Sequence, residues 1–222
     1  LGAATTGDGR NVAIGQGAMV ATTTGAYNVG IGESALGSNT TGGSNVAIGA
    51  TAGDAITTGS RNTLIGKDAG GSISTQDDCV FIGNLCGEAN TASSNTGVGQ
   101  QCLEVNSSGS ALTAVGKMAL EANTSGSYNT AMGHEAGRAN TSGAQNTLIG
   151  RNAGTSLTTG GTNTGVGDGT LGSVTSGTLN TAIGSDAGSN LASGASENTL
   201  LGASSKTGAT NSSHAIVIGS GI

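Results

Sequence analysis

Two histidines are the side chains of this chain best suited to acid–base chemistry at neutral pH. His134 and His214 are the only histidines, and they lie far apart in the sequence. A Ser-His-Asp arrangement needs one histidine held between a nucleophile and an orienting carboxylate. Isolated histidines in separate turns do not meet that requirement, so we expect both to be surface residues.

Other patterns that could carry chemistry are incomplete. Asp77 and Asp78 form an acidic pair, but adjacent carboxylates on a loop are usually solvated and do not define a glycosidase cleft. The glycine-rich segment from Gly165 through Gly167 to Gly169 lacks the Lys-Ser/Thr pair and following helix of a phosphate-binding loop. The calcium-binding β-roll needs an aspartate in every turn, which is absent. We therefore predict no catalytic, cofactor or metal site, and no enzyme.

A repeat organises the whole chain. A glycine follows each short apolar run, and the interval between these glycines is 17 residues, apart from one of 16 and one of 18. These glycines are Gly15, Gly32, Gly49, Gly66, Gly83, Gly99, Gly116, Gly133, Gly150, Gly167, Gly184, Gly202 and Gly219. A fixed period of this kind is the mark of a solenoid. We predict an all-β fold: a β-solenoid, or β-roll, of about thirteen 17-residue coils in a single domain over residues 1–222.

The coil reads N-[TV]-A-I-G-x-x-A-[GL]-x-x-[NL]-T-[TS]-G-x-x, with positions numbered 1 to 17. The coils begin near Asn11, Asn28, Asn45, Asn62, Cys79, Asn95, Leu112, Asn129, Asn146, Asn163, Asn180, Asn198 and Ala215. The β-branched residues before the glycine indicate a short strand. The asparagines of position 1 are expected to form a side-chain hydrogen-bond ladder between stacked coils.

The interior is assigned from residue type. Position 4 is always aliphatic or methionine, and position 2 is always Val, Thr or Ile. Because side chains alternate along a strand, we expect positions 2 and 4 to face inward together. Position 8, which is mostly alanine, is a second inward point, and the glycine of position 15 marks a corner where φ can be positive. Beyond the incomplete first turn, no charged residue lies at positions 1 to 5, so the turns at 6–7, 10 and 16–17 are solvated.

Cysteines and glycosylation motifs follow the repeat. The three cysteines are an odd number without C-x-x-C spacing, which indicates neither a disulfide framework nor a zinc site. Cys86 and Cys102 occupy position 8 of adjacent coils, so we expect small core thiols; a disulfide between them stays open, since it would have to draw parallel Cβ vectors together. The sequons are Asn39, Asn106, Asn123, Asn140 and Asn211. They restate the N-T-[TS] corner and matter only in a eukaryotic secretory setting.

Position 3 predicts an assembly. With positions 2 and 4 inward, position 3 would face solvent, yet it holds no polar residue in any coil. An apolar stripe of that length is unusual on a monomer. Identical chains packed around a common axis would bury it, and the small residues there, such as Ala47 and Gly97, would permit close approach. We expect a parallel homotrimer or a higher assembly of the same chain.

Composition excludes several classes of partner. The net charge is −6, and the seven basic residues are scattered, so no face is suited to nucleic acid. No run of about eighteen apolar residues is present, so we expect no membrane insertion. The chain begins at Leu1 without a signal-peptide pattern, which indicates a fragment or a processed product.

The motif N-[TV]-A-I-G-x-x-A, as in residues 45–52 and 129–136, resembles the head repeats of YadA-type trimeric autotransporter adhesins. It is similar also to the NTAIG-rich repeats of tail-fibre-like proteins of phages and large viruses. The resemblance implies a trimer of β-rolls that is extracellular, on a cell surface or on a virion. It implies a structural fibre or stalk segment that contacts a receptor or glycan. The adhesin repeat is shorter, and this coil adds a T-[TS]-G corner.

An ice-binding β-solenoid is the alternative function. Threonine is dense at positions 13 and 14, as in Thr40-Thr41 and Thr158-Thr159. Adjacent residues of an extended segment point to opposite faces, whereas a flat ice-like array needs threonine at i and i+2. A solenoid lyase or glycosidase is disfavoured, because acids and bases do not gather on one face. We therefore favour the fibre.

Overall fold

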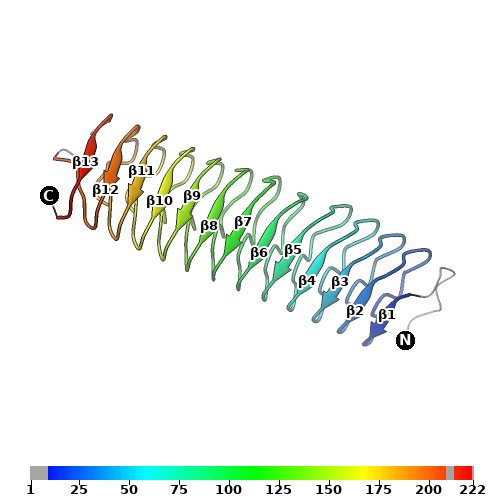
Figure 1. Cartoon of the computed structure of the whole chain (residues 1–222). Coiled ribbons are helices and arrows are strands. Elements are labelled where there is room, and N and C mark those ends of the chain that lie inside the picture. Colours follow the sequence, from blue (N-terminus) through cyan, green and yellow to red (C-terminus); the bar gives the residue numbers. More distant parts are fainter. Residues whose placement is uncertain (1–9, 209–212, 222) are drawn as a thin grey trace. The chain divides into compact units, whose positions relative to one another are not determined.

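The computed structural model describes residues 10–208 and 213–221, in which strands are the only regular elements (Figure 1). The predicted all-β β-solenoid is confirmed, with one three-residue strand per coil at positions 2 to 4. The strands are β1 (Val12–Ile14), β2 (Val29–Ile31), β3 (Val46–Ile48), β4 (Thr63–Ile65), β5 (Val80–Ile82), β6 (Thr96–Val98), β7 (Thr113–Val115), β8 (Thr130–Met132), β9 (Thr147–Ile149), β10 (Thr164–Val166), β11 (Thr181–Ile183), β12 (Thr199–Leu201) and β13 (Ile216–Ile218).

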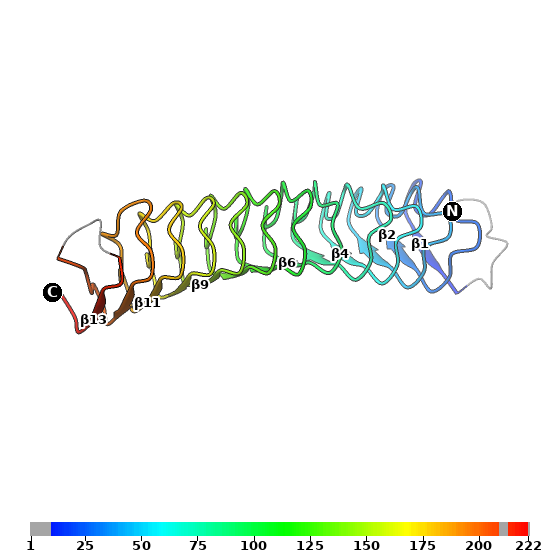
Figure 2. The same ribbon diagram turned by 90° about the horizontal axis from the view of Figure 1, so that it is seen from above.

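The chain divides into two compact units, Leu1–Ser107 and Ser108–Ile222. In the first unit, each strand from β1 to β6 pairs in parallel with the next, position 2 opposite position 2. In the second, β7 to β13 pair in the same way. Seen from above, the strands of each unit lie along one side of its coils (Figure 2). Whether one domain spans the chain stays a prediction.

The strand side chains point in the direction opposite to the predicted one. Position 3 points into the coil: Ala47, Leu64 and Phe81 are completely buried. Position 4 points outward, with Ile48 and Ile149 each 37% exposed. The assignment of positions 2 and 4 to the interior is therefore wrong, and so is the placing of position 3 at a surface between chains. Position 1 is buried, and alternation along the strand places position 3 on the same side as position 1.

The narrow interior explains this orientation. Positions 3 and 9 share one space, and in several coils a large residue at one faces a glycine at the other: Leu64 pairs with Gly70, and Phe81 with Gly87. A Cβ on Gly87 would lie 2.6 Å from the Phe81 ring. The pattern reverses where position 3 is Gly97 and position 9 is the buried Leu103. A β-branched aliphatic residue in every coil would not fit here, so that column lies outside.

The asparagine ladder is confirmed, and backbone groups take part in it. The Oδ1 of Asn11 accepts the backbone N–H of Asn28 at 2.8 Å, one coil later. The Nδ2 of Asn28 donates to the carbonyl of Gly42 at 2.9 Å, across the same coil. Direct amide contacts also occur, as from Asn62 Nδ2 to Asn45 Oδ1 at 3.1 Å. The asparagine amide thus links two successive coils through its Oδ1 and bridges two corners of its own coil through its Nδ2.

Glycine is needed at positions 5 and 15 for different reasons. At position 5, Gly49 has φ of 140°, and a Cβ there would lie 2.4 Å from the carbonyl oxygen of Gly66 in the next coil. At position 15 the expected positive φ is absent from Gly42, which is required by close approach instead, because its Cβ would lie 2.2 Å from the Gly59 oxygen. Positive φ occurs at position 17 in non-glycine residues such as Arg61, at 61°.

The register is tested by charge placement. We expect Leu148→Asp to prevent folding or to lower stability by about 4 kcal/mol or more, because it buries an unpaired carboxylate. Ile149→Asp should cost far less, close to the surface control Arg151→Asp. Thermal melting followed by circular dichroism, at concentrations where light scattering shows monomers, measures all three. A larger loss for Ile149→Asp than for Leu148→Asp would contradict the inward orientation of position 3.

The size match between positions 3 and 9 gives a second test. Gly87→Ala should destabilise by roughly 2–4 kcal/mol, because the methyl group meets the Phe81 ring and φ is 62°. Gly71→Ala is the control, since its Cβ would have no neighbour nearer than 3.6 Å. Chemical denaturation reports both, and equal midpoints would mean that the interior has spare room at Phe81.

Candidate interaction face

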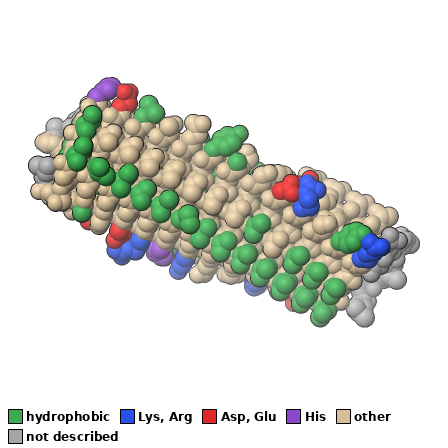
Figure 3. Space-filling model, in the orientation of Figure 1, with side chains coloured by type: hydrophobic (Ala, Val, Ile, Leu, Met, Phe, Trp, Pro, Cys, Tyr) green, Lys and Arg blue, Asp and Glu red, His purple; other side chains and the backbone are tan. Residues whose placement is uncertain are grey.

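The outward side chains of positions 2 and 4 form a surface in each unit that we call the strand face. In the first unit it comprises Val12, Ile14, Val29, Ile31, Val46, Ile48, Thr63, Ile65, Val80, Ile82, Thr96 and Val98. In the second it comprises Thr113, Val115, Thr130, Met132, Thr147, Ile149, Thr164, Val166, Thr181, Ile183, Thr199, Leu201, Ile216 and Ile218. The aliphatic members form rows over the strands in Figure 3.

The strand face is regular and uncharged. Parallel strands lie about 4.8 Å apart, and positions 2 and 4 of one strand about 6.6 Å apart, so each unit presents two straight columns. The position 4 column is aliphatic or methionine throughout, and the position 2 column is mostly valine in the first unit and threonine from β7 to β12 in the second. Nearly all these residues are β-branched and therefore stiff at χ1. Ile14 and Leu201 are 57% and 44% exposed, so each unit has an ordered apolar strip open to a partner.

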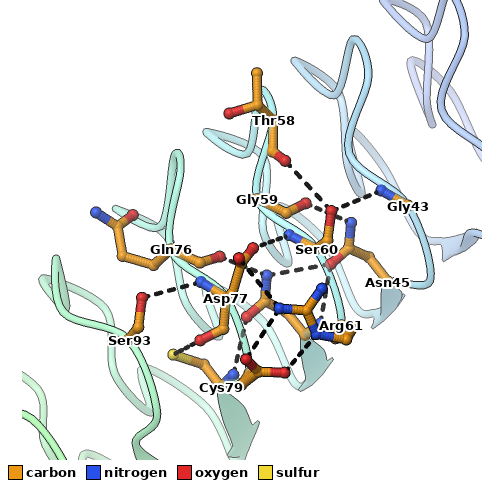
Figure 4. A network of polar contacts seen from close by, with 12 residues as sticks. Gly43, Asn45, Thr58, Gly59, Ser60, Arg61, Gln76, Asp77, Cys79 and Ser93 are labelled. Atoms are coloured by element: carbon orange, nitrogen blue, oxygen red, sulfur yellow. Dashed lines mark hydrogen bonds and ion pairs between the residues drawn. The ribbon is translucent and has the colours of Figure 1, made fainter.

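Charged residues lie on the turns, and opposite charges occupy the same position in neighbouring coils. Arg61 Nε lies 2.6 Å from Asp78 Oδ1, and Arg61 also reaches Asp77 at 3.2 Å. This hydrogen bond holds the pKa of Asp78 below its usual value. Figure 4 shows Asp77 accepting the backbone N–H of Ser60 at 2.7 Å as well. The acidic pair therefore joins coils on the surface and leaves no free pair of carboxylates.

The same arrangement recurs in the second unit. Arg151 Nη2 lies 2.5 Å from Asp168 Oδ2, both at position 6. Arg138 Nε lies 2.7 Å from Glu121 Oε2, both at position 10. All four side chains are partly or largely exposed, so each pair contributes little stability by itself. Each pair joins two neighbouring coils at the surface.

Both histidines are exposed, as expected. His134 Nε2 lies 3.9 Å from Glu135 Oε1, and His214 Nε2 lies 2.7 Å from Glu197 Oε2. Each imidazole thus contacts a solvated carboxylate on a turn and is not held as a buried catalytic base is held. Across the described part of the chain, no three His, Cys, Asp or Glu side chains are grouped as metal ligands.

The glycine-rich segment after Thr164 is part of the solenoid. Gly165 lies in β10, and a Cβ there would come within 2.8 Å of Thr170 Oγ1. The backbone N–H groups of Gly167 and Gly169 donate to carbonyls of the preceding coil, at 2.8 and 2.9 Å. A phosphate-binding loop needs such groups free, so these two are committed to the coil stack.

Four of the five sequon asparagines are buried. Asn39, Asn106, Asn123 and Asn140 occupy position 12 and are at most 1% exposed, so the folded coils leave no room for a glycan there. Asn211 lies outside the described residues.

Sequence reasoning missed the strand face because it ranked positions by hydrophobicity alone. The inverse sizes of positions 3 and 9 were a readable signal, since only residues that share one space compensate for each other.

The described residues, 10–208 and 213–221, contain no helix with the length and apolar character of a membrane span. Comparison with protein-family models, with curated protein sequences and with solved structures finds no match to this chain.

Proposed function

We propose that this chain is a structural segment of a fibre or stalk, extracellular on a cell surface or virion, whose copies pack together through the strand face. The observation that carries the proposal is the aliphatic column of position 4, uninterrupted by charge and outward-facing in both units. The likeness of the N-[TV]-A-I-G motif to trimeric adhesin and tail-fibre repeats supports a trimer. The surface covered on assembly is thus formed by positions 2 and 4 in place of the buried position 3.

The energetics favour a partner of the same kind. Burying apolar surface contributes about 25 cal/mol per Å², and a repeated column sums many small gains. Ordered apolar strips of this extent are rare on monomers. A second copy in parallel presents an identical column at the same spacing, so each isoleucine meets an equivalent one around a symmetry axis.

Because the strand face is covered in the assembly, we assign contact with an external receptor or glycan to the turns. Position 6 carries different residues from coil to coil: Glu33, Lys67, Lys117, His134, Arg151 and Asp168. Stacking places them in one row within each unit, without gathering unlike groups at one point. A row of this kind suits weak contacts multiplied by valency and does not suit catalysis.

Ice binding is the second candidate, and one observation favours it. The second unit places threonine at position 2 of six consecutive strands, β7 to β12, two residues before an outward aliphatic residue. The threonines of position 13 do not serve as a free array, because Thr40 and Thr141 donate their hydroxyls to carbonyls of the next coil at 2.9 and 3.1 Å. The two functions place opposite demands on the strand face: a fibre covers it, and ice binding requires it open.

Assembly is tested by placing charge on the strand face. We expect the wild-type chain to be a trimer, and Ile149→Lys with Ile183→Lys to weaken assembly by about tenfold or more, because two ammonium groups would be desolvated at the interface. Ser142→Lys with Ser176→Lys is the matched control: the same charge one coil earlier in each case, on exposed positions away from the strand face. Sedimentation equilibrium at micromolar concentration gives the mass of each.

A folded wild-type monomer would contradict the fibre proposal. Such a monomer should then be tested for thermal hysteresis and for shaping of ice crystals. Activity lost in Thr147→Lys and kept in Ser142→Lys would support ice binding at the strand face.

Contacts spread over the turns predict gradual loss. Replacing Lys67, Lys117 and Arg151 by glutamine singly should each reduce binding to a target cell or glycan surface by a few fold, and together by the product. Surface plasmon resonance on an immobilised glycan panel measures this. Complete loss on replacing only His134 and Glu135 would instead show one localised site.

A further inference from the structure

Cys86 and Cys102 occupy position 8 of neighbouring coils in the first unit, in a column where most coils have alanine. Both side chains are fully buried. Their Sγ atoms lie 2.8 Å apart, so the sulfurs touch directly. No other pair of successive coils brings two reactive side chains together at this position.

The backbone around the pair holds the two coils at a suitable spacing. The N–H of Gly87 donates to the Cys102 carbonyl at 2.9 Å. Neighbouring parallel segments lie about 4.8 Å apart, within the Cα separation of about 4.4–6.8 Å found across disulfides. The Sγ–Sγ distance of 2.8 Å is longer than the S–S bond length of about 2.05 Å, so the side chains move closer when the bond forms.

Gly97 leaves the space that the sulfurs need. A Cβ at Gly97 would lie 2.8 Å from Cys86 Sγ and 3.0 Å from Cys102 Sγ. Position 3 of the second coil thus has no side chain, beside the two thiols that occupy position 8 of the two coils. A side chain at position 3 of this coil would therefore collide with both sulfurs.

We propose that Cys86 and Cys102 form a disulfide that joins the short coil beginning at Cys79 to the coil beginning at Asn95. With a small-molecule disulfide such as oxidised glutathione as the oxidant, one cysteine first forms a mixed disulfide and releases one glutathione thiol. The second cysteine thiolate then attacks the protein sulfur of that mixed disulfide and releases the second glutathione. The two cysteines lose two electrons, and oxidised glutathione is reduced to two thiols.

The bond forms slowly in the closed coil. The hydrogen bond with Cys102 and burial raise the pKa of Cys86 well above that of a free thiol, so little attacking thiolate is present. Oxidation should proceed as the coil folds or opens. Cys79 is a separate thiol: its Sγ lies 3.4 Å from the Ala92 carbonyl oxygen at the position 1 corner.

The experiment uses the full chain in three forms: wild type, Cys79→Ser, and Cys86→Ala with Cys102→Ala, in which alanine is the usual residue of the column. Each is refolded with oxidised and reduced glutathione, blocked with N-ethylmaleimide and cleaved after glutamate without reduction. Glu88 lies between the two cysteines, so the disulfide appears as two joined peptides. Thermal melting is recorded with and without reductant.

We expect the joined peptides in wild type and Cys79→Ser, and a melting temperature that reductant lowers by about 5 °C or more in both but leaves unchanged in the double alanine variant. Alkylation of both Cys86 and Cys102 in the folded wild type would overturn the proposal. So would glutathione retained on either cysteine, or a bond from Cys79 to either one.

Discussion

Inter-coil hydrogen bonding in strict register is the interaction on which this fold depends. The amide of Asn45 illustrates it: its Nδ2 donates to the Gly59 carbonyl at 2.8 Å, and its Oδ1 accepts the backbone N–H of Asn62 at 3.0 Å. A shift of one residue would break both bonds and turn every strand side chain to the other face. In a coil of 17 residues, one such amide both closes its own coil and bonds to the next.

The two irregular coils show how this constraint is kept when the period changes. In the 18-residue coil, the bond from Asn198 N–H to Asn180 Oδ1 persists at 3.1 Å, and Asn180 Nδ2 reaches Ala195 instead of a glycine. The short coil begins at Cys79, whose N–H donates to Asn62 Oδ1 at 3.0 Å across a regular 17-residue interval. Across the short interval the strands keep their register, with Val80 opposite Thr96. Length differences are taken up at the corner before the next position 1.

Where a column of equivalent positions contains both asparagine and aliphatic residues, a buried amide oxygen can be left without a hydrogen-bond partner. At position 12, Asn140 donates to Asn123 Oδ1 at 2.9 Å, but the next coil has Leu157 there, and Asn140 Oδ1 has no hydrogen-bond partner among the described residues. Asn39, followed by Ile56, is left in the same condition. In both cases the unpaired acceptor lies where a polar residue of the column is followed by an aliphatic one. A column need not be uniform for the coils to stack.

The fold class, the coil boundaries, the buried asparagine ladder, the inward position 8 and the exposed, charged turns could all be predicted from the sequence. Each of these depends on spacing or on the high cost of burying charge, and both can be read along a chain. The direction of the strand side chains could be assigned only from the tertiary structure, because Ile149 and Leu148 are equally apolar and residue type does not distinguish them. What separates them is the space opposite: Leu148 fills the volume left by Gly154, whose added Cβ would lie 2.7 Å from Leu148 Cδ2. Contact between Cys86 and Cys102 likewise required the empty position at Gly97, since sequence spacing places residues in one column but does not show which side chains have room to meet.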